Sequence, residues 1–318
     1  MATAKWDLDS RISRRVKLRD LHILSVVVHC GSMAKAAPHL AISQSVVSDA
    51  ISNLEEALHV RLLDRSPQGI EPTIYARALL KRGQAIFDEL SEGIKDIEFL
   101  ADQKVGEVRL ACPEFLSSGF LPLVVDRFSR SYPQVVIRVV QQDTTTLQCP
   151  ELRERVVDLL LTRIHSMGDD VDVEYLFDDP QYVVAGSNSP WTQKSEIDLR
   201  ELVDEPWILP PSPTTTDLIK SQFEARGLKG PSVMLDTSSI LLRKHMLGTG
   251  RFLSVMPHSM IESAAKEWSI QAIPVDLRLQ GPPIAVVTLK NRTLSPVVQM
   301  FIEDLRQVAK TMSSAVQT

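Results

Sequence analysis

The sequence predicts a helix-rich N-terminal unit containing a helix-turn-helix, then one long helix, then an α/β region. Three observations lead to this prediction. Two short apolar helical repeats between residues 33 and 58 are separated by a tight break. A single helical repeat follows, from residue 74 to about residue 103. From residue 105 onward, short apolar segments alternate with helical ones, which favours sheets covered by helices.

The first helices are predicted from their apolar faces and their end signals. Residues 18–30 form the first, and Gly31 follows it at a position that favours glycine. Ser32 can cap the next helix, residues 33–40, and Ser43 can cap the one after it. Residues 41 and 42 form the turn between these two helices.

The helix after Ser43 has two different faces. Its apolar face repeats with helical spacing at Val47, Ile51, Leu54 and Leu58. Short side chains on the other face would let the helix lie in the major groove of DNA and bond to base edges. These side chains are Gln44, Ser45, Ser48, Asp49 and Ser52. DNA binding is therefore the leading hypothesis from this segment alone.

A small hairpin and a long helix are predicted next. Two extended pieces, residues 61–64 and 70–71, flank a turn that contains proline and glycine, which indicates a wing. Thr73 can cap the long helix, and an exposed helix with one apolar seam normally buries that seam against a partner. We therefore favour self-association over packing within the same domain. The seam consists of Leu79, Ile86, Leu90, Ile94 and Ile97.

Charge and composition restrict the class of protein. The net charge is −5, but residues 1–83 carry 12 Lys and Arg against 8 Asp and Glu, whereas the rest carry 23 against 32. Only the N-terminal part is therefore suited to meet phosphate. No apolar run approaches the roughly 18–20 residues of a membrane span, and no leader pattern occurs, so we expect a cytoplasmic protein without a membrane partner. Residues 1–17 form a basic extension, which is either a DNA-contacting arm or a solubilising tail.

The α/β region alternates strands and helices, which predicts parallel sheets covered by helices. We expect strands at residues 107–112, 135–141, 158–162, 181–185, 207–209, 252–256 and 284–288. We expect helices at residues 118–131, 147–156, 214–226, 239–247 and 295–314.

The N-terminal residues resemble the winged helix-turn-helix of LysR-type transcriptional regulators, a bacterial family. The matching positions are Ser32, Ala36, Ala37, Leu40, Ser43, Gln44, Ser48, Leu54, Glu55, Leu58 and Arg65. The resemblance continues through residues 18–310. It implies a dimer or tetramer that binds double-stranded promoter DNA at an interrupted inverted repeat. It also implies a two-lobed α/β effector domain similar to periplasmic binding proteins, with a ligand cleft between the lobes.

These considerations divide the chain into four parts: a basic extension (1–17), a winged helix-turn-helix (18–76), a linker and dimerisation helix (77–104) and an effector-binding domain (105–318). The chain departs from the family pattern at several positions. Asp49 and Ser52 replace the usual cations, which should weaken phosphate attraction unless Lys35, Arg65 and other nearby basic residues compensate. His59 and Ala76 replace usual glycines, and Pro38 should kink or shorten its helix. Together with the exposed face described above, Ser32, Lys35, Ser43 and Arg65 complete the predicted DNA-binding set.

Ligands of α/β domains bind beyond the carboxyl ends of strands, in a crevice between lobes. A strand ends at Pro113, and the helix expected after it would offer free amides and hydroxyls to an anion. By the resemblance, this loop lines the effector pocket, together with Ser and Thr side chains at other strand ends. The predicted set is Pro113, Ser117, Ser118, Thr144, Thr162, Thr214 and Ser238. It favours a small polar effector, with a carboxylate as one candidate group. Arg163 is either a partner of that group or a surface charge.

Other functions fit the sequence less well. An enzyme is disfavoured because the phosphate, nucleotide and nucleophile motifs are missing, and no catalytic residue, cofactor or metal ligand set is predicted. A solute-binding protein would leave residues 1–100 unexplained. The three cysteines, Cys30, Cys112 and Cys149, do not suggest a disulfide framework or a metal motif. A redox sensor would need Cys112 and Cys149 to lie within about 7 Å of each other, measured between Cα atoms.

Overall fold

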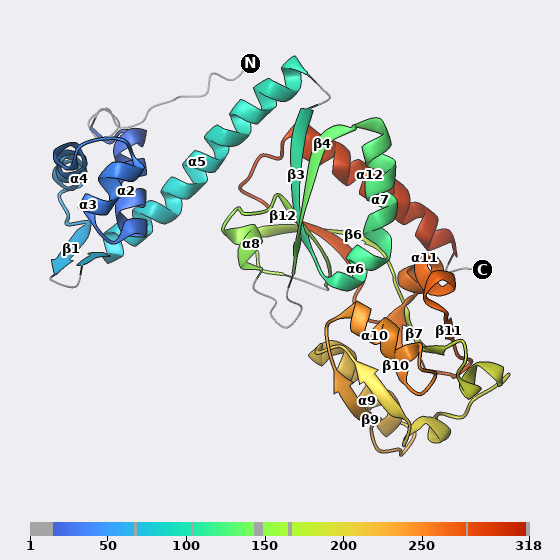
Figure 1. Cartoon of the computed structure of the whole chain (residues 1–318). Coiled ribbons are helices and arrows are strands. Elements are labelled where there is room, and N and C mark those ends of the chain that lie inside the picture. The colour runs from blue at the N-terminus through green and yellow to red at the C-terminus, as the bar shows by residue number, and fades with distance from the viewer. Residues whose placement is uncertain are drawn as a thin grey trace. The chain divides into compact units, whose positions relative to one another are not determined.

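The structure is a computed structural model that describes residues 15–66, 69–102, 105–142, 149–164, 167–277 and 279–315. It divides into two compact units, Met1–Ser91 and Glu92–Thr318 (Figure 1). Most of the basic extension predicted for residues 1–17 lies outside the described residues. Within the described part, no helix is both long and apolar enough to cross a membrane.

The first unit contains the predicted helices and wing. Its elements are α2 (Leu18–Cys30), α3 (Met33–His39), α4 (Gln44–Leu58), β1 (Leu63–Ser66), β2 (Gly69–Pro72) and the start of α5 (Ile74–Ala101). Gly31 ends α2 in the left-handed conformation, at φ 64°. Ser43 caps α4, because its hydroxyl accepts a hydrogen bond from the amide of Val46 at 3.4 Å. The end signals at Gly31 and Ser43 therefore act where they were predicted, whereas Ser32 precedes α3 without a side-chain cap hydrogen bond.

The core of this unit lies between the first three helices. Val47, Ile51 and Leu54 on α4 are fully buried, as the apolar face predicts. Glu55, next to that face, holds the start of the wing, because its Oε1 accepts hydrogen bonds from the amides of Leu62 at 2.7 Å and Leu63 at 3.2 Å. This carboxylate thus ties the start of the wing to α4, and the amide of Ile70 ties β2 to the carbonyl of Gly31 at 3.1 Å.

His59 occupies a backbone conformation that favours glycine. It ends α4 with φ 56° and ψ 31°, in the left-handed region. We expect His59→Gly to raise the free energy of unfolding by about 1 kcal/mol, because a side chain at this position is strained. Urea unfolding measures the change. The matched variant His39→Gly places glycine in the last residue of α3 and should instead lower stability by about 1 kcal/mol. A loss of stability in both variants would contradict this account.

The second unit begins with the last turns of α5 and contains two five-stranded sheets, one in each lobe. The first lobe pairs its strands in the order β4-β3-β5-β12-β6, and the second in the order β11-β7-β10-β8-β9. The strands of the first lobe are β3 (Val105–Cys112), β4 (Gln134–Gln141), β5 (Leu159–Arg163), β6 (Val171–Phe177) and β12 (Ile284–Leu289). Those of the second are β7 (Gln181–Gly186), β8 (Pro206–Leu209), β9 (Ser232–Asp236), β10 (Leu253–Pro257) and β11 (Ile270–Ala272).

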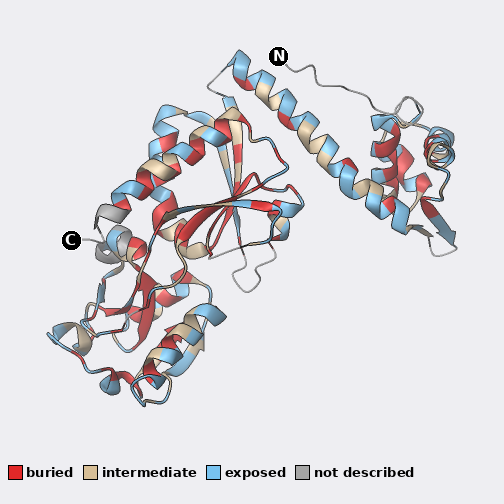
Figure 2. Ribbon diagram, turned by 180° about the vertical axis from the view of Figure 1, so that it is seen from behind, coloured by how far each residue is buried: buried red, intermediate tan, exposed pale blue. Residues whose placement is uncertain are grey.

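Helices cover both sheets. In the first lobe they are α6 (Glu114–Ser118), α7 (Phe120–Ser131), α8 (Pro150–Arg153) and α12 (Pro296–Ala315); in the second, α9 (Pro213–Glu224), α10 (Ile240–Leu247), α11 (His258–Trp268) and the short 3-10 helices η1 (Pro190–Gln193) and η2 (Leu199–Leu202). α7 and α12 pack beside each other on one face of the first sheet, where Phe128 meets Phe301 edge to face. Figure 2 shows that buried residues follow the strands of both lobes.

The prediction of parallel sheets is only partly right. β3 is parallel to β4 and β5, but β12 is antiparallel to β5 and β6, and β7 is antiparallel to β10. The reason is that the chain leaves the first lobe after β6 and returns to it only for β12. No strand-helix-strand crossover therefore joins β12 to its neighbours.

Two predicted helices are wrong in their bounds. The helix expected over residues 118–131 is α7 (Phe120–Ser131), which starts two residues later, and a separate short helix, α6 (Glu114–Ser118), ends just before it at Gly119. A side-chain carbon at Gly119 would lie 3.1 Å from the amide nitrogen of Met260, so a close backbone approach fixes this break. The helix expected over residues 147–156 is the short α8, and Arg155 just after it has a left-handed φ of 60°.

Several elements of the second unit were not predicted at all: the strands β6, β9 and β11, the helices α6 and α11, and the 3-10 helices η1 and η2. β6, β9 and β11 carry few buried residues, and α11 starts directly after β10 without a loop. Edge strands with polar or exposed faces produce no strong apolar pattern in a sequence.

Candidate functional site

The polar face of α4 is accessible, as a DNA-binding surface requires. Gln44, Ser45, Asp49 and Ser52 are exposed, and Ser48 is half-buried. The hydroxyls of Ser43 and Ser45 lie 2.9 Å apart at the start of the helix. Because the opposite face is buried in the core, the helix presents these short polar side chains on a rigid support.

The other predicted DNA-binding residues lie at α3 and on the wing. Ser32 is half-buried at the start of α3, and Lys35 on the same helix is exposed. Arg65 is exposed on β1 of the wing, opposite Ile70 on β2. Arg15 and Lys17, before α2, line a shallow hollow with Asn53 of α4. The described cations are thus distributed around the polar face of α4 rather than on it.

Most of the apolar seam of α5 is exposed in the part of the chain that the structure describes. Ile86, Leu90, Ile94 and Ile97 are 46, 51, 52 and 68% exposed, whereas Leu79 is half-buried. Figure 2 shows α5 mostly in the colours of exposed and intermediate residues. So many large apolar side chains along one helix indicate an interaction surface.

The second candidate site is a pair of cavities between the lobes of the second unit. The first has a volume of about 130 Å³ and the second of about 430 Å³. The first is lined by Phe115, Gln142, Thr162, Arg163, Gln181, Pro210, Ser212, Thr214, Thr215, Leu218, Arg243, Val255, Pro257, Gly281 and Pro282. The second is lined by Pro113, Glu114, Phe115, Gln141, Gln142, Pro210, Pro211, Ser238, Ile240 and Arg243.

The structure brings together part of the predicted effector set. Thr162 and Thr214 line the first cavity, and Pro113 and Ser238 line the second. Ser117 and Ser118 are in the lining of neither cavity; the hydroxyl of Ser117 lies 3.0 Å from the sulfur of Cys112 instead. The helix expected to start near Ser117 starts at Glu114, which moves its N-terminus toward Pro113. Thr144 lies outside the described residues.

Arg163 is already paired within the protein. Its Nη2 lies 3.2 Å from Oδ2 of Asp179, and its Nη1 donates to the carbonyls of Asp179 and Pro282 at 2.9 and 3.1 Å. Burial lowers the pKa of Arg163, which the carboxylate of Asp179 partly offsets. Arg163 is therefore neither a surface charge nor an unpaired cation, and it ties together the two segments that connect the lobes.

Three buried polar residues of the cavities were missed by the sequence reasoning: Gln142, Gln181 and Arg243. Gln142 follows β4 and Arg243 lies on α10; both line both cavities. One signal could have identified Arg243, because it stands between the buried residues Ile240 and Leu247 in the apolar stripe of its helix. A cation in such a stripe is unusual in a globular protein. Gln142 carries no comparable signal.

The cysteines do not form a pair in this structure. Cys112 packs with Val108 and Leu110 on one face of the first sheet, whereas Cys149 packs with Ala111 on the other face. Both are free thiols, and burial raises the pKa of each. The hypothesis of a redox pair is thus not supported by their placement. Among the described residues, no cluster of His, Cys, Asp and Glu could hold a metal ion.

A winged helix-turn-helix joined by a long helix to a two-lobed α/β domain defines a class of DNA-binding regulators. Comparison with known proteins gives the family. Residues 18–77 match the description "Bacterial regulatory helix-turn-helix protein, lysR family", and residues 101–310 match "LysR substrate binding domain". The chain belongs to the LysR family of transcription regulators, which are regulators rather than enzymes.

Individual relatives are similar over nearly their whole length. The transcriptional regulator GbpR of Azospirillum brasilense is 23% identical over 97% of this chain and 90% of its own. The crystal structure of the LysR regulator CbnR covers 92% of this chain and 99% of its own, with 22% identity and a TM-score of 0.60. CbnR in complex with its target DNA matches at a TM-score of 0.52, with 23% identity, over 92% of this chain and 100% of its own. The fold predicted from the sequence is thereby confirmed.

Proposed function

We propose that this regulator reads its operator with the polar face of α4 and that a small polar effector, carrying a carboxylate, binds between the two lobes. The observation that carries the DNA-binding assignment is the exposure of Gln44, Ser45, Asp49 and Ser52 on the face of α4 opposite the buried Val47, Ile51 and Leu54. The cavities supply the effector site, because side chains of both lobes line them. The complex of CbnR with its target DNA supports the first part.

Gln44 is the side chain best suited to read a base. Its amide is exposed in the first turn of α4, and a glutamine amide can bond to both edge groups of an adenine. We expect Gln44→Ala to weaken binding to the operator by about 1–3 kcal/mol, which is about 5- to 150-fold, without changing binding to random DNA. Fluorescence anisotropy with both duplexes measures this.

The control for Gln44 is Asn53→Ala. Asn53 is an exposed amide on the same helix, but it lies beside Arg15 and Lys17 and outside the polar row. It should leave the preference for the operator nearly unchanged. An equal effect of the two variants, or no effect of Gln44→Ala, would refute the assignment of this face.

Self-association through α5 completes the proposal. Two copies that bury their α5 seams would carry two recognition helices related by a two-fold axis, and the operator would be an interrupted inverted repeat. We expect Ile86→Asp or Leu90→Asp to dissociate the oligomer, because each would bury a carboxylate in an apolar interface. Sedimentation equilibrium measures the mass. Ser91→Asp, an exposed position next to the seam, should leave the mass unchanged. An unaltered mass in all three variants would refute self-association through the apolar seam of α5.

The effector would act by favouring one arrangement of the lobes. It shifts the equilibrium between two arrangements only by its difference in affinity for them. A ligand that contacts both lobes at once binds the closed arrangement more tightly than the open one, because opening the lobes separates the side chains that hold it. This is why a site lined by both lobes suits a regulator.

A further inference from the structure

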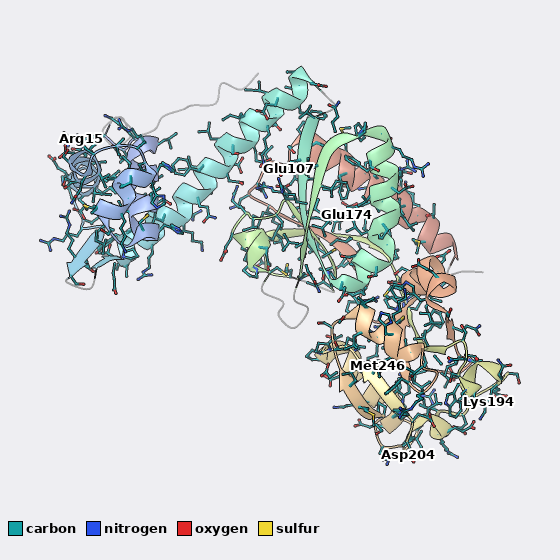
Figure 3. All side chains as sticks on the ribbon, viewed as in Figure 1. Arg15, Glu107, Glu174, Lys194, Asp204 and Met246 are labelled. Carbon is teal, nitrogen blue, oxygen red and sulfur yellow. The ribbon has the colours of Figure 1, made fainter. Side chains whose placement is uncertain are left out.

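Arg243 and Gln142 stand where the two cavities meet. Both line each cavity, and they come from different lobes, since Gln142 follows β4 in the first lobe and Arg243 lies on α10 in the second. A small molecule that touches both side chains therefore connects the lobes. Figure 3 shows the side chains of the two lobes, with Glu107 and Glu174 labelled in the first and Met246, on α10, in the second.

Arg243 is a buried cation that forms no ion pair with the residues that the structure describes, although the carboxylate of Glu114 is near enough to act on its charge. Only 4% of the residue is exposed. Its Nη1 donates to the carbonyl of Val255 at 3.2 Å, but its buried Nε has no hydrogen-bond partner among the described residues. Within that part of the chain no carboxylate forms an ion pair with it; Glu114, which acts on it electrostatically, bonds through Oε1 to the amide of Ile240 at 3.1 Å. A guanidinium has five donors, so most of its bonding capacity is unused.

The charge of Arg243 persists at neutral pH. Burial lowers its pKa to about 10, and the charge of Glu114 opposes this effect. The side chain is therefore a full positive charge held away from water next to a cavity. Burying an unpaired charge is costly, and an anion bound beside the guanidinium would offset that cost.

Gln142 offers the complementary group. It is 7% exposed, and its Nε2 donates to the sulfur of Cys149 at 3.1 Å. That bond leaves the buried Oε1 of the amide without a partner among the described residues. A carbonyl oxygen of this kind accepts a hydrogen bond from a hydroxyl or amino group. Among the described residues that line the two cavities, the buried side-chain atoms without a hydrogen-bond partner are thus Nε of the Arg243 cation and the Oε1 acceptor of Gln142.

The rest of the first cavity limits the size and polarity of the molecule. Leu218, Val255 and Pro257 contribute apolar surface, and the volume of about 130 Å³ is of the order of the roughly 150 Å³ that holds one benzene ring. A polar head at Arg243 can extend into the second cavity. One unpaired cation matches one negative charge.

We propose that Arg243 reads the charge of the effector and Gln142 reads a hydrogen-bond donor beside it, so that the effector is a small monocarboxylate bearing a hydroxyl or amino group on a short apolar body. This inference rests on the proposed role of the cavities as the effector site. It assigns the charge recognition to Arg243 and not to Arg163, whose guanidinium is already engaged by Asp179.

Calorimetric titration of the full-length protein with three matched probes tests the inference. The probes are 2-hydroxy-4-methylpentanoate, 4-methylpentanoate, which lacks the donor, and 2-hydroxy-4-methylpentanamide, which lacks the charge. The hydroxy acid should bind tightest. Loss of the hydroxyl should weaken binding about 10-fold, and loss of the charge about 100-fold, because each leaves a buried protein group unpaired.

Variants separate charge recognition from a structural role. Arg243→Met should remove the preference for the acid over the amide, while the melting temperature of the unliganded protein stays equal or rises, because an unpaired buried charge has gone. Arg243→Lys should keep the preference in weaker form. Arg251→Met removes the same charge from an exposed position in the same lobe and should change neither property.

Three results would overturn the inference: equal binding of the acid and the amide, a preference that survives in Arg243→Met, or no binding of any probe at millimolar concentration. Preference for operator DNA over random DNA is measured on the same preparations. A protein without this DNA preference would count against the proposed function. Recognition of the effector's charge by Arg243 is judged from the titrations alone. The two failures are therefore distinguishable.

Discussion

Asp179→Ala is expected to lower the free energy of unfolding by about 3–5 kcal/mol, the effect of removing one partner of a buried ion pair. The carboxylate of Asp179 is 1% exposed and lies 3.2 Å from Nη2 of Arg163. It also accepts hydrogen bonds from the amide and hydroxyl of Ser259, at 3.0 and 2.9 Å, near the start of α11. Its removal leaves a buried guanidinium without its charge partner and frees the start of that helix.

The location of this pair makes its loss costly for the arrangement of the lobes as well. Asp179 lies in the segment that leaves the first lobe, and Arg163 also bonds to Pro282 in the segment that returns. Urea unfolding followed by circular dichroism measures the loss of stability. Asp178→Ala, an exposed neighbour, is the control and should cost less than about 1 kcal/mol. Equal losses in the two variants would show that the buried pair has no special role.

Asp158→Ala is expected to have an effect of similar size, about 3–5 kcal/mol, for a related reason. Asp158 is 3% exposed and joins two arginines: its Oδ1 lies 2.6 Å from Nη2 of Arg109 and 2.9 Å from Nη2 of Arg292. Its Oδ2 also accepts the amide of Arg109 at 2.8 Å. Without this carboxylate, two cations remain close together with Glu92 as their nearest shared anion.

This network fixes the last turns of α5 to the first lobe, because Glu92 lies on that helix and bonds to Arg109 at 2.9 Å. Hydrogen exchange of the amides from residue 94 to residue 101 should therefore become faster in Asp158→Ala. Asp172→Ala, exposed on β6, changes the same residue type in the same lobe and should leave both the stability and the exchange nearly unchanged. Unaltered exchange together with unaltered unfolding in Asp158→Ala would contradict the role given to the network.

The N-terminal unit was predictable almost residue by residue because its signals are local. Val47, Ile51 and Leu54 recur with helical spacing, and Ser43 and Gly31 mark helix ends through bonds to near neighbours. Each of these signals acts within a few residues along the chain. The same holds for the apolar seam of α5, which the sequence showed and the structure leaves exposed.

The α/β unit was less predictable because its organisation depends on distant contacts. Arg292 and Glu92 are 200 positions apart, and no local pattern announces their pairing. The antiparallel setting of β12 follows from the passage of the chain through the second lobe and back, which short segments do not reveal. The same distinction separates the cavity residues. Thr162 and Thr214 were predicted because they stand at the ends of a strand and a helix along the chain. Gln142 was missed because its place depends on its contact with Cys149.

The central claim is that α4 gives this protein a sequence preference in DNA despite Asp49 and Ser52. The most direct measurement is the affinity of the full-length protein for the duplex upstream of its own gene and for a scrambled duplex, across a salt series. Phosphate contacts make both affinities fall as salt rises, but only base contacts separate them. We predict tighter binding to the native duplex at every salt concentration. Equal affinity for the two duplexes throughout the series would contradict the account.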